Sequence, residues 1–160
     1  MSQWRLLLTR PAEDCVALAQ SLAAAGVGSS CLPLLAIEPV TVEPRQRLLL
    51  EGLHGFQAII VVSKPAARLL LEQLAEASLQ PPRQGWFTVG EATAAVLQGA
   101  GLEVNTPPRG DDSEALLALP ALLQAVAVPA ARVLVVRGVG GRELLAERLA
   151  EQGASVEYLE

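Results

Sequence analysis

Short apolar runs alternate with amphipathic stretches along the whole chain, separated by polar or glycine-containing turns. Apolar runs of about four to eight residues are typical of buried strands, whereas apolar positions three and four residues apart are typical of helices. The pattern predicts strands at residues 4–8, 30–32, 58–62, 86–89, 102–104, 132–136 and 155–158. It predicts helices at residues 11–25, 66–77, 92–98 and 142–152. Strands that alternate with helices indicate an α/β fold with parallel, doubly wound sheets.

Two segments interrupt this alternation. Residues 32–39 contain two prolines, so we interpret them as an extended connector between domains. Residues 105–112 have the composition of a loop, after which Ser113 is expected to cap a further helix. The opening strand-helix-strand unit is too small to bury both faces of its sheet alone. It therefore needs a partner chain, or a natural protein that continues past Glu160.

The first strand-helix unit recurs late in the chain at one constant offset. The matching pairs are Arg5 and Arg132, Arg10 and Arg137, Leu18 and Leu145, Leu22 and Leu149, and Gly26 and Gly153. In each copy an arginine lies just past the end of the strand, and ligands of open α/β sheets bind at that edge. The repeat suggests two similar halves that face a negatively charged ligand.

Composition excludes several kinds of site. The chain is 51% hydrophobic with a net charge of -5, which disfavours a general nucleic-acid or anionic-membrane surface. Lys64 is the only lysine among 12 basic residues; arginine suits carboxylate or phosphate binding, although codon bias explains the same excess. His54 is the only histidine and both cysteines stand alone, so neither a metal site nor a histidine-based triad is expected. The N-terminus does not have the layout of a signal peptide, and prolines interrupt the longest apolar run. These two observations predict a cytoplasmic protein with no membrane partner.

Polar residues and glycines follow several predicted strands, and parallel strands bring such residues to one edge of a sheet. Backbone N–H groups at helix N-termini lie at the same edge and attract anions. A ligand with several negative charges would be held by these candidates: Thr9, Arg10, Ser63, Lys64, Gly90, Thr93, Arg137, Gly138 and Arg142. The alternative stays open here, because the same residue types are ordinary helix caps and turn formers.

No motif identifies a nucleotide site or a self-sufficient catalytic group. Gly138-Val-Gly-Gly141 lacks the spacing of a dinucleotide fingerprint, and the turn at Gly90 lacks the lysine of a phosphate-binding loop. Asp111 and Asp112 are adjacent, but no third metal ligand is evident for them. Nucleotide binding is therefore weakly supported, and the sequence shows no complete metal site.

Six further segments occur in a characteristic order: Arg5-Leu-Leu-Leu-Thr-Arg-Pro11, Leu32-Pro-Leu-Leu-Ala-Ile-Glu-Pro39, Ile59-Ile-Val-Val-Ser-Lys-Pro-Ala-Ala-Arg68, Thr88-Val-Gly-Glu-Ala-Thr-Ala94, Asp112-Ser-Glu-Ala-Leu-Leu117 and Val136-Arg-Gly-Val-Gly-Gly-Arg-Glu143. Together they resemble the uroporphyrinogen-III synthase family, which closes the tetrapyrrole ring. Each segment alone is weakly specific in this divergent family. Together, the six segments occur in the family's order and span essentially the whole chain. Thr93 lies in the family's Gly-x-Ala-Thr-Ala turn, while Lys64-Pro65 depart from the asparagine often found after that serine.

The resemblance implies two α/β domains joined by a two-stranded connector, with the first domain discontinuous. The implied limits are residues 1–35 for the opening of domain one, 36–39 for the connector, 40–155 for domain two and 156–160 for the start of the return connector. The implied reaction needs no cofactor: hydroxymethylbilane, a linear tetrapyrrole polycarboxylate, loses water and closes with inversion of ring D, in haem, sirohaem and cobalamin biosynthesis. The implied substrate-binding residues, in a cleft between the domains, are Thr9, Arg10, Ser63, Lys64, Thr93, Arg137, Gly138 and Arg142.

The catalytic residue and the assembly state stay open. The family tyrosine that could donate a proton to the leaving hydroxyl is expected beyond Glu160, because Tyr158 comes too early. The 160-residue form is therefore expected to be incomplete and inactive, a monomer when full length and a possible swapped dimer as given. The alternative from another class is a non-catalytic α/β module that binds a ligand or dimerises.

Overall fold

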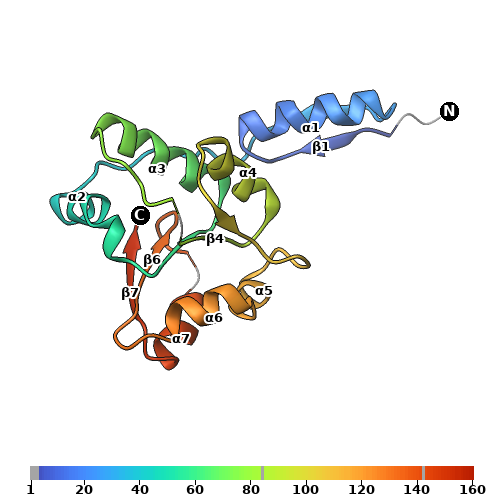
Figure 1. Ribbon diagram of the computed structural model, residues 1–160. Helices are drawn as coiled ribbons and strands as arrows, with labels where there is room; N and C mark the ends of the chain where they lie inside the picture. The colour runs from blue at the N-terminus through green and yellow to red at the C-terminus, as the bar shows by residue number, and fades with distance from the viewer. Residues whose placement is uncertain (1–3, 84, 142) are drawn as a thin grey trace. The chain divides into compact units, whose positions relative to one another are not determined.

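The computed structural model describes residues 4–83, 85–141 and 143–160 (Figure 1). The chain divides into two compact units, residues 1–39 and residues 40–160. The larger unit contains a five-stranded sheet and the smaller unit a two-stranded sheet, and all strand pairs are parallel. The α/β class with parallel sheets, which the alternation of strands and helices predicts, is confirmed.

The sheet of residues 40–160 is doubly wound, with strand order β5-β4-β3-β6-β7. Its strands are β3 (Ala58–Val61), β4 (Trp86–Thr88), β5 (Val104–Asn105), β6 (Arg132–Val136) and β7 (Ser155–Leu159). The chain moves outward in one direction from β3 to β5 and in the other from β6 to β7. β3 and β6 therefore flank the topological switch point, the usual place for a ligand in an open α/β sheet.

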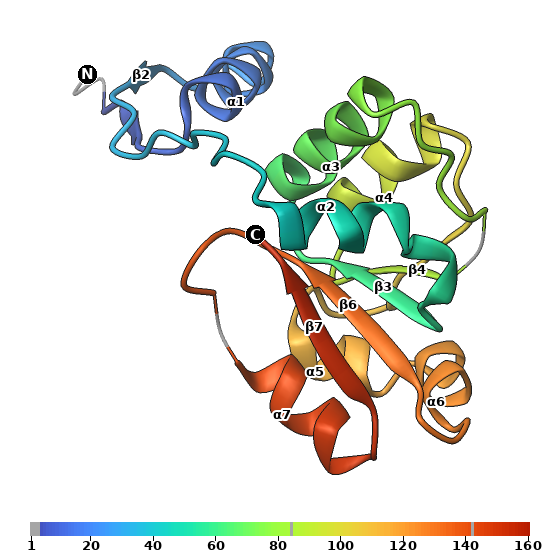
Figure 2. The same ribbon diagram turned by 90° about the vertical axis from the view of Figure 1, so that its left-hand side faces the viewer.

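Helices cover both faces of this sheet (Figure 2). One face carries α2 (Pro44–Glu51), α3 (Lys64–Glu76) and α4 (Glu91–Gly99); the other carries α5 (Ser113–Leu117), α6 (Pro120–Val126) and α7 (Leu144–Glu151). Ile59 and Leu134 pack in the first layer, whereas Ile60 and Val135 pack in the second. Successive strand residues point to opposite faces, so these continuous apolar strands are buried on both sides.

Local sequence explains where two of the helices begin. Ser63 caps α3, because its hydroxyl accepts a hydrogen bond from the Ala66 backbone N–H at 3.3 Å. The predicted cap at Ser113 is wrong: Asp112 caps α5, and its carboxylate accepts the Ala115 N–H at 2.8 Å. A carboxylate one residue earlier reaches the same turn, so Ser113 becomes the first helical residue.

Patterning did not predict α2. A capping box joins Glu43 and Gln46 at its start, and Pro44 occupies the first turn. Leu49 and Leu50 are buried, and the short 3-10 helix η1 (Leu53–Gly55) leads on to β3. Three consecutive leucines lack the spacing that distinguishes a helix from a buried strand, so the caps were the only local signal.

The chain end also differs from the implied limits. Residues 156–159, assigned to the start of a return connector, lie within β7. β7 pairs with β6 over its whole length, so these residues belong to the five-stranded sheet.

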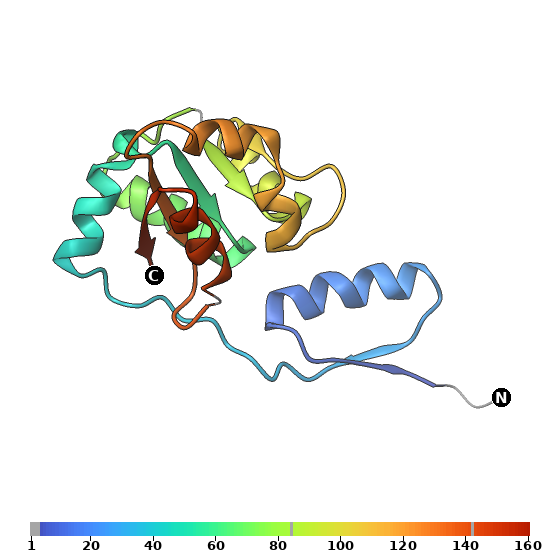
Figure 3. The ribbon, with the colours of Figure 1, turned by 90° about the horizontal axis from the view of Figure 1, so that it is seen from below.

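Residues 4–39 form a strand-helix-strand unit (Figure 3). β1 (Leu6–Leu8) and β2 (Ser29–Cys31) are a parallel pair, and α1 (Ala12–Ala24) connects them. Leu8 and Cys15 are buried, but this small unit leaves many apolar side chains exposed. They are Trp4, Leu6, Leu7, Val16, Leu32, Leu34, Leu35 and Ile37. Among the residues that the structure describes, each helix is too short or too polar to cross a membrane.

Candidate functional site

A cavity of about 520 Å³ opens at the switch point of the five-stranded sheet. Val62 and Ser63 line it from the end of β3, and residues 137–141 line it from the end of β6. Asp111, Asp112 and Ser113, at the start of α5, complete its polar wall. The cavity thus joins the carboxyl ends of the two strands where the winding direction reverses.

A second cavity of about 580 Å³ lies near the starts of β3, β4 and β5. Its described lining residues include Gln57, Gly85 and Glu103, and no arginine or lysine is among them. Without a cation, this cavity is poorly suited to a polycarboxylate. The cavity at the switch point is therefore the better candidate for an anionic ligand.

The structure brings three predicted site residues together on the switch-point cavity: Ser63, Arg137 and Gly138. Ser63 uses a lone pair to cap α3, so its O–H remains a donor for a ligand. Gly138 is exposed, and the space that a Cβ would occupy there is open.

Other predicted site residues lie apart from that lining. Lys64 is the first residue of α3, and Thr93 lies in the first turn of α4, after Gly90. Thr93 is only 6% exposed, so little of its side chain can meet a ligand in this state. Thr9 and Arg10 are exposed directly after β1 in the smaller unit, and Arg142 lies outside the described residues.

The two arginines of the late repeat copy have different surroundings. Arg132 begins β6, where it pairs with Glu157 at 2.7 Å and lies over the Phe56 ring at 4.3 Å. Arg137 follows β6 at the opposite edge and lines the cavity. Only the second arginine can therefore serve a ligand at the switch point.

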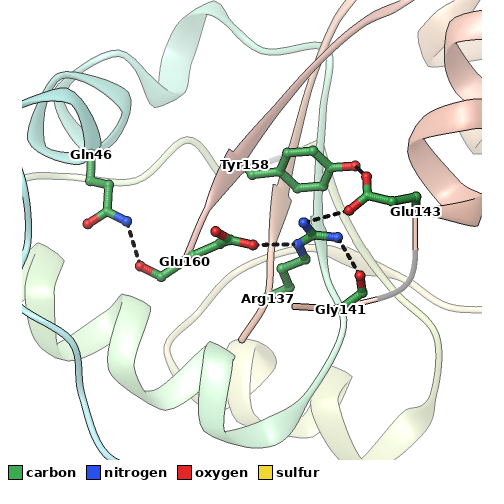
Figure 4. Close-up of polar contacts among 6 residues, drawn as sticks. All are labelled: Gln46, Arg137, Gly141, Glu143, Tyr158 and Glu160. Carbon is green, nitrogen blue, oxygen red and sulfur yellow. Dashed lines mark hydrogen bonds and ion pairs between the residues drawn. The ribbon is translucent and has the colours of Figure 1, made fainter. Parts of the chain in front are cut away.

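Among the described residues, two glutamates and a backbone carbonyl contact the Arg137 guanidinium (Figure 4). Nε donates to Glu160 Oε1 at 2.9 Å, Nη1 donates to the Gly141 carbonyl at 3.0 Å, and Nη2 pairs with Glu143 Oε1 at 2.9 Å. The guanidinium carbon lies 3.8 Å from the centroid of the Tyr158 ring. The Tyr158 hydroxyl donates to the other oxygen of Glu143.

This cluster shifts the ionisation of its members. Burial raises the pKa of Tyr158 to about 12, and the hydrogen bond to Glu143 adds to that increase. The hydrogen bonds from Tyr158 and Arg137 hold the pKa of Glu143 below its usual value. Burial alone would lower the pKa of Arg137, but the hydrogen bonds to Glu143 and Glu160 raise it. At neutral pH Tyr158 is therefore neutral, whereas Arg137 and Glu143 are charged.

Sequence reasoning missed Glu143, Tyr158 and Glu160 as neighbours of Arg137. By position, Tyr158 comes too early for the family tyrosine, and the sequence predicts no contact between Tyr158 and Arg137. The pairing of β6 with β7 places Tyr158 beside Val135, two residues before Arg137. That register was the missing signal, because it brings the end of the chain to the end of β6.

Chemically, the cavity offers both hydrogen-bond donors and acceptors. Arg137, the Ser63 hydroxyl and the backbone N–H groups of a helix start suit carboxylates. Asp111 and Asp112 suit N–H donors of a ligand. A ligand with carboxylates and ring N–H groups would match both sets.

Comparison with known proteins places the chain in a family. The family described as uroporphyrinogen-III synthase HemD matches residues 16–160. Uroporphyrinogen-III synthases of Salmonella typhimurium and Proteus mirabilis are 32% and 34% identical over 97% of this chain, covering 63% and 77% of those relatives. The structure is also similar to that of a mutant uroporphyrinogen III synthase from Thermus thermophilus, with a TM-score of 0.68, 22% identity, and coverage of 98% of this chain and 61% of that one. That similarity is evidence for the fold.

The chain thus spans about 63% of the length of the Salmonella relative. A family match over residues 16–160 nevertheless includes the switch-point cavity and the whole five-stranded sheet. The chain belongs to the uroporphyrinogen-III synthase family.

Proposed function

We propose that the protein takes part in uroporphyrinogen-III synthesis: hydroxymethylbilane is cyclised with inversion of ring D and loss of water. The observation that carries the proposal is the switch-point cavity, where Ser63, Arg137 and Gly138 meet in a chain of this family. The proposed role of residues 1–160 is to hold the substrate polycarboxylate in a folded conformation. Positioning of a flexible reactant can supply much of a reduction in barrier without a strong acid or base.

The residues proposed to bind substrate follow the chemistry of each position. Arg137 would pair with a carboxylate, and Ser63 and Gly138 would donate from a hydroxyl and a backbone N–H. Lys64, Thr93 and Arg142 are proposed as further contacts in domain two. Thr9 and Arg10 are the proposed donors of the smaller unit, at the carboxyl end of β1.

The test separates binding from catalysis. Hydroxymethylbilane is incubated with the 160-residue chain, the products are oxidised, and uroporphyrins I and III are separated by chromatography. We expect the spontaneous type I product from the chain alone. A fusion that appends the unmatched part of the Proteus mirabilis relative should produce type III. If the fusion folds and binds uroporphyrin III but forms only type I, the proposed reaction is wrong.

The exposed apolar residues of the smaller unit favour a second property, self-association. Leu7 is 60% exposed, Leu34 71% and Leu35 58%. Because large exposed apolar groups mark interaction surfaces, we propose a swapped dimer for the 160-residue form and a monomer for a longer protein. Light scattering during size-exclusion chromatography should give twice the 16.8 kDa mass of the chain. The double variant Leu7→Glu/Leu35→Glu should have the mass of one chain. If the wild-type chain also has the mass of a monomer, the proposed dimer is wrong.

A cytoplasmic location stays a prediction.

A further inference from the structure

The guanidinium proposed to bind substrate already has carboxylate partners within the chain. Arg137 pairs with both Glu143 and Glu160, each at 2.9 Å, and its side chain is only 9% exposed. Among the residues that the structure describes, two carboxylates therefore contact one guanidinium. A third carboxylate that approached Arg137 would be repelled by both of them.

We propose that Glu143 occupies Arg137 as an internal carboxylate, and that a carboxylate of the bound substrate takes its place. The inference rests on the proposed function, because it concerns the same cavity and the same ligand class. Glu143 is then a specificity-determining residue: it competes with every anion that reaches Arg137.

Exposure and anchoring indicate which glutamate leaves. The Glu143 side chain is 54% exposed, against 30% for Glu160. Glu160 directly follows β7, and its backbone carbonyl accepts a hydrogen bond from Gln46 Nε2 at 2.7 Å. The Arg137 backbone N–H also donates to the Leu159 carbonyl at 3.0 Å, which holds the end of β7 against Arg137. Glu143 makes no side-chain cap on α7, so its release leaves the helix start unchanged.

The exchange favours a ligand with several carboxylates. An intramolecular carboxylate competes at an effective concentration of about millimolar or more, so a single weakly bound carboxylate displaces it poorly. When other donors already hold a polycarboxylate, its remaining carboxylates are present near Arg137 at a high effective concentration. The Glu143 side chain is 54% exposed, so solvent weakens its pairing with Arg137, and the substrate loses little affinity when it displaces Glu143.

The experiment compares Glu143→Ala with Glu147→Ala in the 160-residue chain. Glu147 is exposed on the same helix, and its replacement makes the same change in net charge away from Arg137. Binding of uroporphyrin III, a tetrapyrrole polycarboxylate, is measured by its fluorescence. We expect Glu143→Ala to bind about two- to fivefold more tightly than the wild type. Glu147→Ala should stay near the wild-type affinity.

Tyr158 supplies a second readout, since it is the only tyrosine of the chain. With carbon-13 at its ring ζ carbon, saturating uroporphyrin III should shift the resonance in the wild type, because Tyr158 loses its Glu143 acceptor. The shift should be much smaller in Glu143→Ala, where that acceptor is already absent. A merely structural role of Glu143 predicts no such difference.

The outcomes separate the two proposals. If uroporphyrin III binds but Glu143→Ala matches Glu147→Ala, or the wild-type Tyr158 resonance stays in place, the exchange is wrong and the proposed function stands. If uroporphyrin III binds none of the folded chains, the proposed substrate binding is wrong, and the exchange is wrong with it. Circular dichroism confirms that each variant is folded.

Discussion

Replacement of Gly138 by aspartate should weaken the binding of uroporphyrin III by about tenfold or more. Gly138 lines the switch-point cavity, and a Cβ at this position meets open space, so the fold should accept a side chain. The backbone N–H is kept, and only a negative charge beside Arg137 is added. Two like charges a few ångströms apart repel by roughly 1–4 kcal/mol near a protein surface, and about 1.4 kcal/mol corresponds to tenfold in affinity.

Gly138→Asn is the matched control for this prediction. It has nearly the same shape without the charge, so its affinity should lie within about threefold of the wild type. The difference between the two variants should also shrink as salt is added, because salt screens exposed charges. If both variants lost the same affinity for uroporphyrin III, the shape of the new side chain and not its charge would be the cause. If Gly138→Asp bound uroporphyrin III as tightly as the wild type, the proposal that substrate carboxylates bind in this cavity would be wrong.

Leu134→Ala should lower the free energy of unfolding by about 2–5 kcal/mol, the range for a buried leucine. Leu134 is fully buried in β6, between Ile59 of β3 and Glu157 of β7. Its side chain packs in the layer that contains α2, α3 and α4. Loss of these contacts leaves a cavity that a central strand cannot close by moving, since both neighbours hold it. Urea unfolding followed by circular dichroism measures the change.

Leu48→Ala provides the control with the same chemical change. Leu48 lies on α2 but is 68% exposed, so its replacement should change stability by no more than about 0.5 kcal/mol. If both variants lost the same stability, the two-layer core around β3 and β6 would not be the main source of stability.

Most of the strands could be predicted because apolar runs have a strong local signature. β6 occurs at residues 132–136 as expected, and the other strands lie within about two residues of their predicted positions. α2 could not be predicted in this way, since its leucines are consecutive and its buried face depends on the sheet beneath it. The cap of α5 was misassigned because Asp112 and Ser113 are equally good caps by residue type.

The candidate site was predictable in part for the same reason. Ser63 and Gly138 lie two residues after β3 and β6, and parallel strands must deliver such residues to one edge. The environment of Arg137 was not predictable, because Glu143, Tyr158 and Glu160 reach it through the turn after β6 and through strand pairing. For Thr93 the position was predictable but the burial was not. Its motif marks the start of a helix, whereas tertiary packing leaves its side chain only 6% exposed.

By itself, the sequence determined the α/β class, the positions of most strands and the residues at their carboxyl ends. These features depend on local periodicity and on turn chemistry, both of which lie within a few neighbouring residues. Only the tertiary structure decided that β3 and β6 are neighbours, that a cavity opens between their ends, and that Arg137 already binds two glutamates. Those properties depend on strand order and register, which bring together residues far apart in the chain and are not encoded in any one segment.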